Sequence, residues 1–180
     1  MTDFFQMTDF FQMIAARRSV RAYEDRGVER ETLLQIVEAA RSAPSAGNLQ
    51  AYDIVVVEDA ERRSAIAHAA LDQRHVALAP AVLVFFRNGP RSAAKYGKRG
   101  KELYACQDAA IACTYAQLAA AALGLGSCWT GAFRGAPIRE LLRAPEGLDP
   151  VALLSVGYPA EDPSPTGRLP LAETVHWETF

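Results

Sequence analysis

The sequence predicts an α+β fold in which helices pack on a β-sheet. Helix-like and strand-like patterns are mixed along the 180 residues, but they do not alternate strictly as they do in a doubly wound fold. Half of the residues are hydrophobic and 22% are charged, which provides enough apolar material for one sizeable core. The net charge of -2 gives no sign of a nucleic-acid-binding surface.

The first six residues are expected to lie outside the folded domain. Their sequence, MTDFFQ, is repeated directly in residues 7–12, and a copy of that length is too short for a repeat architecture. A cloning scar or an alternative start at Met7 explains the duplication, and the segment does not have the pattern of a targeting sequence. We therefore predict one domain over residues 7–180, beginning with a helix at residues 8–16.

Two helices and two strands are expected in the first half of the domain. Apolar residues recur at helical spacing over residues 31–43, and Pro44 ends that helix. The β-branched run YDIVVV predicts a strand over Tyr52–Val57, and residues 59–71 are predicted to be helical again. The continuous apolar run AVLVFF at residues 81–86 predicts a strand that is covered on both faces.

The most distinctive element is a long alanine-rich helix predicted over residues 103–123 and closed by Gly124. Apolar residues surround it almost completely, which predicts burial on every side and a place in a dimer interface. A membrane span is excluded because alanine is only weakly apolar and polar residues interrupt the run. The interrupting residues are Gln107, Asp108 and Gln117.

The segments on either side of this helix have weaker patterns. The polar residues 87–101 are expected to form an exposed loop or a short helix. Residues 126–133 predict a strand or turn, residues 137–143 a short helix, and residues 151–156 a third strand. The proline-rich tail that follows has no periodicity, so it either frays or wraps around a partner subunit.

Two polar segments have the composition of a ligand site. The run RRSVR at residues 17–21 places three arginines and a hydroxyl near a helix end, and guanidinium groups match phosphate oxygens. A solvated basic patch explains this run equally well. The segment PSAGNLQ at residues 44–50 combines small residues with two amide side chains, which suit the polar edge of a flat ring. A helix stop followed by a turn is the simpler explanation of this segment when it is taken alone.

Several other chemistries are excluded. The glycines between Gly124 and Gly131 have the wrong spacing for a dinucleotide-binding loop, and they follow a helix instead of a strand. No phosphate-binding P-loop is present, and the three histidines lie in no nucleophile or metal motif. The three cysteines lack the spacing of a metal site, and their odd number favours a reducing, cytoplasmic location.

Four motifs in one order resemble the nitroreductase family of FMN enzymes. They are the RRSVR run, the PSAGNLQ segment, the stretch from Tyr96 to Trp129 with its YGKRG and GLGSCW sequences, and the tail from GYP to VHW. The resemblance covers nearly the whole chain, from about residue 17 to residue 177. Each motif is weak alone, but the ordered set is specific.

The resemblance implies a three-layer sandwich with a mixed central sheet flanked by helices. It also implies a homodimer that exchanges C-terminal tails and binds two FMN molecules at its interface. The residues implied to bind the cofactor are Arg17, Arg18, Ser19, Arg21, Pro44, Ser45, Ala46, Asn48, Gln50, Gly131, Ala132 and Arg168.

The resemblance also implies a role for each part of this set. Arg17, Arg18 and Arg168 would hold the phosphate, while Arg21 and Asn48 would face the edge of the isoalloxazine. The small residues at positions 44–46 would reach the flavin from the partner chain, and backbone groups near Gly131 would lie by the reactive ring nitrogen. A fixed cation such as Arg21 would stabilise the anionic charge of reduced flavin.

Two positions depart from the family pattern. Ala51-Tyr52 stands where the family often has Pro-Trp, which is expected to reshape the substrate side. Gly167 stands where a basic residue often precedes Arg168, which is expected to remove one phosphate contact. The chain is also short, so the helical insertions of larger members are expected to be absent.

The implied activity is hydride transfer from NADH or NADPH, through FMN, to an electron-poor acceptor by a ping-pong mechanism. A nitroaromatic, a quinone or a free flavin would serve as that small-molecule acceptor. The cofactor supplies the chemistry, so neither a catalytic acid–base pair nor a metal is expected. The alternatives are a flavoenzyme of the same fold that oxidises heterocycles, removes halogens or degrades flavin, and a flavin-binding dimer without turnover.

Overall fold

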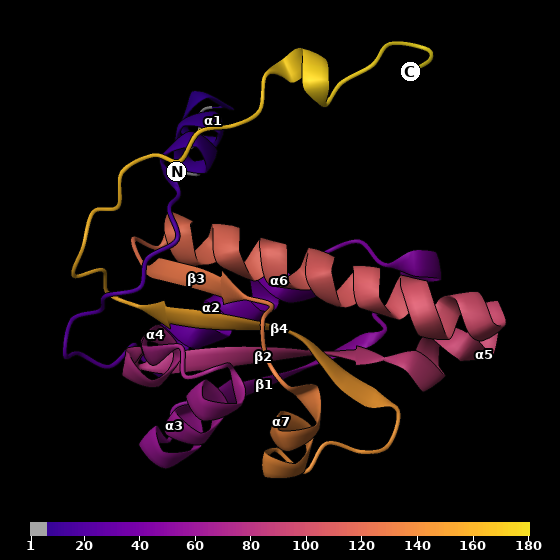
Figure 1. Cartoon of the computed structure of the whole chain (residues 1–180), viewed down its shortest axis with the longest axis horizontal. Coiled ribbons are helices and arrows are strands. Elements are labelled where there is room, and N and C mark those ends of the chain that lie inside the picture. Colours follow the sequence, from indigo (N-terminus) through magenta and orange to yellow (C-terminus); the bar gives the residue numbers. More distant parts are fainter. Residues whose placement is uncertain (1–6) are drawn as a thin grey trace, which may run out of the picture.

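The computed structural model describes residues 7–180, and the predicted assignment of residues 1–6 lies outside the described residues. Four strands form one sheet in the order β1-β2-β4-β3, and each neighbouring pair is antiparallel. Helices cover both faces of the sheet, so the chain forms the three-layer α+β sandwich that the sequence predicts (Figure 1). The strands are β1 (Tyr52–Val57), β2 (Ala81–Asn88), β3 (Gly126–Thr130) and β4 (Leu148–Gly157).

One face of the sheet is covered by two helices and the other by three. The helices on the first face are α2 (Arg30–Arg41) and α6 (Ala105–Ala122), and those on the second are α3 (Ala60–Ala69), α4 (Arg74–Leu78) and α7 (Gly135–Leu141). The remaining elements are α1 (Met7–Ala16), α5 (Gly89–Arg99), the π-helical segment Gly100–Tyr104 and the short 3-10 turns Ala46–Asn48 and Leu171–Glu173.

Strand β2 shows why both faces of the sheet are apolar. Leu83 and Phe85 are fully buried against α2 and α6, whereas Val82, Val84 and Phe86 are buried on the other side. Successive side chains of a strand point to opposite faces, so a continuous apolar run serves two cores at once. The prediction of a strand covered on both faces is thus confirmed.

Most predicted elements are present within a few residues of their expected ends. Three differences have a physical reason. Residues 89–104, expected to form an exposed loop or a short helix, form helix α5 followed by a π-helical turn, and the side chain of Asn88 caps α5 by accepting the backbone N–H of Arg91. Helix α4 was not predicted because it is only five residues long. Strand β4 is the fourth strand and not the third, because residues 126–130 are a strand as well.

The expectation that the alanine-rich helix is buried on every side is wrong for a single chain. Helix α6 buries a stripe of small residues that includes Ala109, Ala112 and Ala116, against β2, β4 and α2. Its outer side stays open, with Ile111, Tyr115 and Leu123 between 36% and 40% exposed. A helix with apolar residues all round therefore has one face on its own core and one face without a partner.

The expected mixed character of the sheet is limited to one bridge. The four strands pair antiparallel throughout, and the parallel pairing of the described residues is the bridge between Ser19 and Ser127 on β3. Val20 donates its backbone N–H to the carbonyl of Ser127 at 3.0 Å. The segment that carries the arginine run is therefore fixed along the edge of β3.

Candidate functional site

Four arginines converge on one pocket at the N-terminal side of the molecule. Arg17, Arg18, Arg21 and Arg168 line a cavity of about 420 Å³ together with Ser19 and residues 163–166. Within residues 10–180, whose side chains the structure describes, none of these four guanidinium groups forms an ion pair with a carboxylate. A set of like charges without internal partners is suited to a strongly anionic ligand.

The pocket is built by joining two distant parts of the chain. The backbone N–H groups of Arg21 and Ala22 both donate to Oε1 of Glu161, at 2.5 Å and 3.1 Å. Tyr23 forms a backbone bridge with Pro159, and Ala160 donates its N–H to the carbonyl of Ala22 at 3.0 Å. These contacts align residues 21–23 with residues 159–161, so the tail that follows carries Arg168 back to the arginine run.

The packing of Tyr158 reinforces this alignment. Its hydroxyl donates to Oε2 of Glu29 at 2.6 Å, and the guanidinium of Arg26 lies 3.8 Å from the centre of its ring. The hydroxyl of Tyr158, and then the guanidinium of Arg26, lower the pKa of Glu29 to about 2. Glu29 therefore stays ionised, and its hydrogen bond with Tyr158 holds the start of the C-terminal tail against the segment before α2.

An apolar pocket adjoins the arginine pocket. It has a volume of about 660 Å³ between α1, the C-terminal end of α6 and the start of β3, and it shares Arg17, Arg18 and Pro163 with the arginine pocket. A charged pocket and an apolar pocket side by side can accept a ligand or segment with one anionic and one apolar part.

The second predicted segment, residues 44–50, lies at the opposite end of α6. Its residues Pro44, Ser45 and Ala46 line a pocket of about 560 Å³ together with Tyr104, Gln107, Asp108 and two further residues of α6. The segment has a tight, unusual backbone: Gly47, Asn48 and Gln50 have φ angles of 58°, 56° and 43°. Asn and Gly tolerate this left-handed region better than other residues, which explains their presence here.

Asn48 and Gln50 are not both free to face a ligand within one chain. Nε2 of Gln50 donates to Oδ1 of Asn48 at 2.7 Å and to its backbone oxygen at 2.6 Å. The backbone N–H of Gln50 donates to Oγ of Ser45 at 2.9 Å. The amide nitrogen of Asn48 remains the outward donor of this pair.

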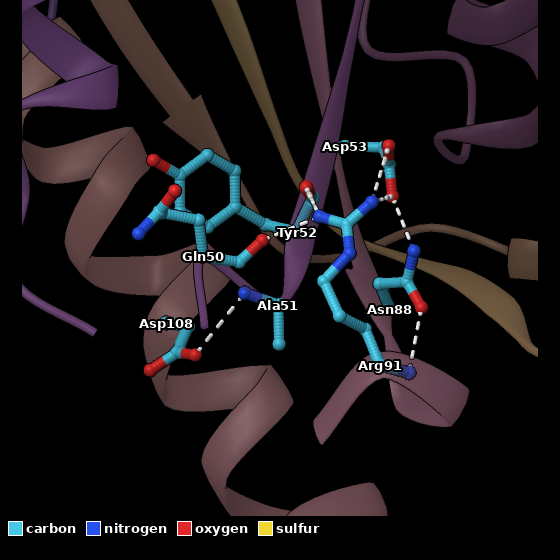
Figure 2. Close-up of polar contacts among 7 residues, drawn as sticks. All are labelled: Gln50, Ala51, Tyr52, Asp53, Asn88, Arg91 and Asp108. Atoms are coloured by element: carbon cyan, nitrogen blue, oxygen red, sulfur yellow. Dashed lines mark hydrogen bonds and ion pairs between the residues drawn. The ribbon is translucent and has the colours of Figure 1, made fainter. Parts of the chain in front are cut away.

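A buried carboxylate holds the segment in place. Asp108 is only 2% exposed, and its two carboxylate oxygens accept the backbone N–H groups of Ala46 at 2.9 Å and Ala51 at 3.3 Å. Both ends of the segment are thus tied to one side chain of α6, as Figure 2 shows for Ala51. The sequence signal for this role is an acidic residue within a largely apolar helix.

Arg91 fixes the backbone where the 44–50 segment continues into β1. Figure 2 shows Arg91 of α5 donating to the backbone oxygens of Gln50 and Tyr52, at 2.5 Å and 3.0 Å. Nη2 of Arg91 lies 3.3 Å from the carboxylate of Asp53. The same carboxylate also accepts a hydrogen bond from Nδ2 of Asn88 at 2.7 Å. Sequence reasoning did not find this network, because it left residues 87–101 open between an exposed loop and a short helix.

The departure at Ala51-Tyr52 affects the core more than the site. Ala51 is fully buried, and Tyr52 is 6% exposed with its hydroxyl donating to the backbone oxygen of Ala40 at 3.2 Å. Tyr52 therefore packs on α2, away from the pocket at residues 44–46. The other departure, Gly167, has no atom within 4 Å of the position that a Cβ would occupy.

The third predicted part, Gly131 and Ala132, is an exposed turn after β3. His75 lies 2.9 Å from Oγ1 of the buried Thr130, and Gln73 donates to the backbone oxygen of Ala132 at 3.0 Å. Burial, and then the positive charge of Arg21, lower the pKa of His75. Gln73 and His75, at the start of α4, therefore hold this turn, a role that the sequence did not reveal.

The structure thus assembles the predicted residues in two groups at the two ends of α6. The arginine group contacts residues 121–127 at its C-terminal end, and the 44–50 group contacts residues 104–111 at its N-terminal end. Helix α6 has 18 residues, which at 1.5 Å per residue separates the groups by roughly 27 Å. One chain does not bring both groups to the same small molecule.

Two further structural observations concern metals and membranes. No group of three or more His, Cys, Asp or Glu side chains in residues 7–180 could hold a metal ion. In the same part of the chain, no helix has the length and apolar character needed to cross a membrane.

Comparison with known proteins identifies the family. The profile of the Nitroreductase family matches residues 14–158, so the chain belongs to this family and the resemblance seen in the sequence is confirmed. The FMN reductase [NAD(P)H] of Bacillus subtilis is 36% identical, over 91% of this chain and 71% of the relative. The NADH dehydrogenase of Thermus thermophilus is 35% identical, over 89% of this chain and 92% of the relative.

The solved structures agree with the family assignment. The NADPH:FMN oxidoreductase from Vibrio harveyi, solved in complex with NAD+, superimposes with a TM-score of 0.87 at 30% identity. The match covers 95% of this chain and 77% of that structure. The fold is therefore shared over nearly all of this chain, while the longer relatives contain additional residues.

Replacing the buried carboxylate should loosen the 44–50 segment. We expect Asp108→Ala to lower the free energy of unfolding by roughly 2 kcal/mol, because two backbone N–H groups lose their acceptor. Urea denaturation would measure this effect, and Gln107→Ala, on the exposed neighbour, is the matched control. Equal stability of the two variants would show that Asp108 does not hold the segment.

Proposed function

We propose that two copies of this chain form an enzyme that passes hydride from NADH or NADPH, through FMN, to an electron-poor acceptor in a ping-pong cycle. The convergence of Arg17, Arg18, Arg21 and Arg168 on one pocket, where they have no ion-pair partner among the described side chains of residues 10–180, carries this proposal. A monoester phosphate with nearly two negative charges is the natural counterpart of such a group. When bound, FMN supplies the hydride-transfer chemistry, so the protein has to bind, orient and shield it.

The residues of this chain divide that work. Arg17, Arg18 and Arg168, with the hydroxyl of Ser19, would bind the phosphate, and the charge of Arg21 would favour negative charge on the nearby ring edge. Gly131 and Ala132 would present backbone groups to the ring, because His75 and Gln73 fix their turn. No side chain would be required to transfer a proton, because the cofactor supplies the chemistry.

The second group of predicted residues would come from the partner. The 44–50 segment lies at the far end of α6 from the arginine pocket, so Pro44, Ser45 and Ala46 reach a flavin only if it is bound to another copy. Asn48 would then direct its free amide donor to the ring edge, with Gln50 holding it in place. Two equivalent sites would result from one two-fold symmetric interface.

The open face of α6 and the free tail support the homodimer. Ile111, Tyr115 and Leu123 form an apolar outer side on α6. The tail after residue 163 runs past α1 and away from the body of the chain (Figure 1), with Leu171 73% and Trp177 85% exposed. Exposed apolar side chains of the tail are suited to a partner's surface, and the 660 Å³ apolar pocket offers such a surface.

The cytoplasmic location stays a prediction from the sequence.

The reaction itself is tested by anaerobic titration. We expect the purified protein to be yellow and its flavin absorbance to bleach when NADH or NADPH is added. Addition of a nitroaromatic, a quinone or free flavin should then restore the oxidised spectrum without any donor present. Retention of the oxidised spectrum in excess NADH and NADPH would instead favour a binding protein without turnover.

The phosphate pocket is tested by comparing FMN with riboflavin, which lacks the phosphate. We expect Arg17→Gln and Arg168→Gln each to weaken FMN binding roughly tenfold or more, as for the loss of a charged hydrogen bond. Riboflavin binding should change little in both variants, and Arg62→Gln, on the exposed surface of α3, is the control. Fluorescence titration measures both ligands, and an equal loss for FMN and riboflavin would contradict the assignment.

The shared site is tested by charging the open face of α6. We expect Tyr115→Arg to produce a monomer by analytical ultracentrifugation and to abolish tight FMN binding, because each site would lose the partner's 44–46 segment. Leu78→Arg is the matched control, since Leu78 is a 58% exposed apolar residue on the other side of the sheet. A monomeric Tyr115→Arg protein that binds FMN normally would show that one chain forms the whole site.

A further inference from the structure

A cluster of cations and aromatic rings lies directly against the 44–50 segment. It consists of Lys95, Tyr96 and Arg99 on α5 and Tyr104 at the end of the π-helical turn. Tyr104 lines the same 560 Å³ pocket as residues 44–46. A Cβ at Gly47 would lie 2.8 Å from Nζ of Lys95 and would also strike the hydroxyl of Tyr96, so both side chains reach the backbone of the segment.

The two rings and the two cations form one connected surface. The rings of Tyr96 and Tyr104 meet edge to face, with their centres 5.2 Å apart. Nζ of Lys95 lies 5.4 Å from the centre of the Tyr96 ring, and Nε of Arg99 donates to the hydroxyl of Tyr104 at 2.9 Å. Each cation is therefore held beside a ring.

The charges of this cluster are not neutralised within the described chain. Lys98 pairs with Glu102 at 3.9 Å, whereas Lys95 and Arg99 take part in no ion pair with the described side chains of residues 10–180. Other arginines near the segment are paired: Arg87 with Asp149 and Arg91 with Asp53. Lys95 and Arg99 thus present free positive charge beside the pocket.

The backbone of this region departs from regular α-helical geometry at two places. Gly97 interrupts α5 with a φ of 57° and a ψ of -140°, a conformation open essentially to glycine alone. A π-helical turn over Gly100–Tyr104 then leads into α6, and such turns are frequent at functional sites. These two irregularities lie between Tyr96 and Tyr104.

We propose that this cluster selects the acceptor, and that it favours flat aromatic acceptors that carry a carboxylate or another anionic group. The ring faces of Tyr96 and Tyr104 suit a flat molecule, and Lys95 and Arg99 suit its negative charge. The inference rests on the proposed function, because the 44–46 segment beside the cluster would contact the partner's flavin.

The test compares an anionic acceptor with a neutral acceptor of the same shape. In the Lys95→Gln/Arg99→Gln double variant, we expect KM for 4-nitrobenzoate to rise about tenfold, equivalent to 1.4 kcal/mol, with KM for 4-nitrobenzamide nearly unchanged. The conservative variant Lys95→Arg/Arg99→Lys should retain most of the preference for the anion. Lys98→Gln, on the same segment but paired with Glu102, is the control and should behave as the wild type.

A binding measurement without turnover separates this proposal from the proposed function. Benzoate and benzamide do not react, and NMR titration of the oxidised dimer should show weaker binding of benzoate alone in the double variant. Equal changes for the anionic and neutral ligands, or none for either, would overturn the acceptor site.

A rise in KM confined to NADPH, with benzoate binding intact, would also overturn it and assign the cations to the donor's phosphate. A protein that lacks FMN but binds benzoate through these cations would refute the proposed function and retain the anion site.

Discussion

The structure depends on holding four like charges together at one pocket. Arg17, Arg18, Arg21 and Arg168 repel one another, and no described carboxylate of residues 10–180 forms an ion pair with them. Backbone pairing provides the restraint: Val20 is bonded to β3, and Glu161 accepts two N–H groups of the opposite segment. The carboxylate of Glu161 is thus engaged with the backbone and leaves the guanidinium groups available. The proposed anion-binding site would thus be formed at the expense of local electrostatic energy, which the ligand would recover.

Helix α6 determines how the two halves of the site are distributed. Its inner stripe of alanine lets β2, β4 and α2 approach closely, and its length keeps the arginine pocket and the 44–50 segment apart. The same helix presents an apolar outer side with no cover in its own chain. The separation of the half-sites and the open face therefore lead to the same proposal, a site completed by a second copy.

Buried and half-buried polar groups give the 44–50 segment its shape. Asp108 accepts two backbone N–H groups, and Arg91 donates to two backbone oxygens, so the turns of this segment are satisfied from both sides. Such networks are costly when incomplete and rigid when complete. Rigidity here matters for function, since a flat ligand would be held by small residues that contribute little contact area themselves.

The sequence by itself determined the layers of the fold and the chemical character of the site. Period-two and period-3.6 apolar patterns depend on local backbone geometry, so β1, β2 and the long helix could be located within a few residues. The four ordered motifs identified the family, and the arginines and small residues they contain are the ones that line the two pockets. Tertiary structure alone decided which distant groups meet. It paired Asp108 and Arg91 with backbone atoms, placed His75 beside Thr130, and turned residues 89–104 into a helix with a cationic, aromatic surface. All of these contacts join residues far apart in sequence, and those of Asp108 and Arg91 are made to the main chain. Backbone donors and acceptors are identical at nearly every position, so a residue pattern does not record which of them a side chain will meet.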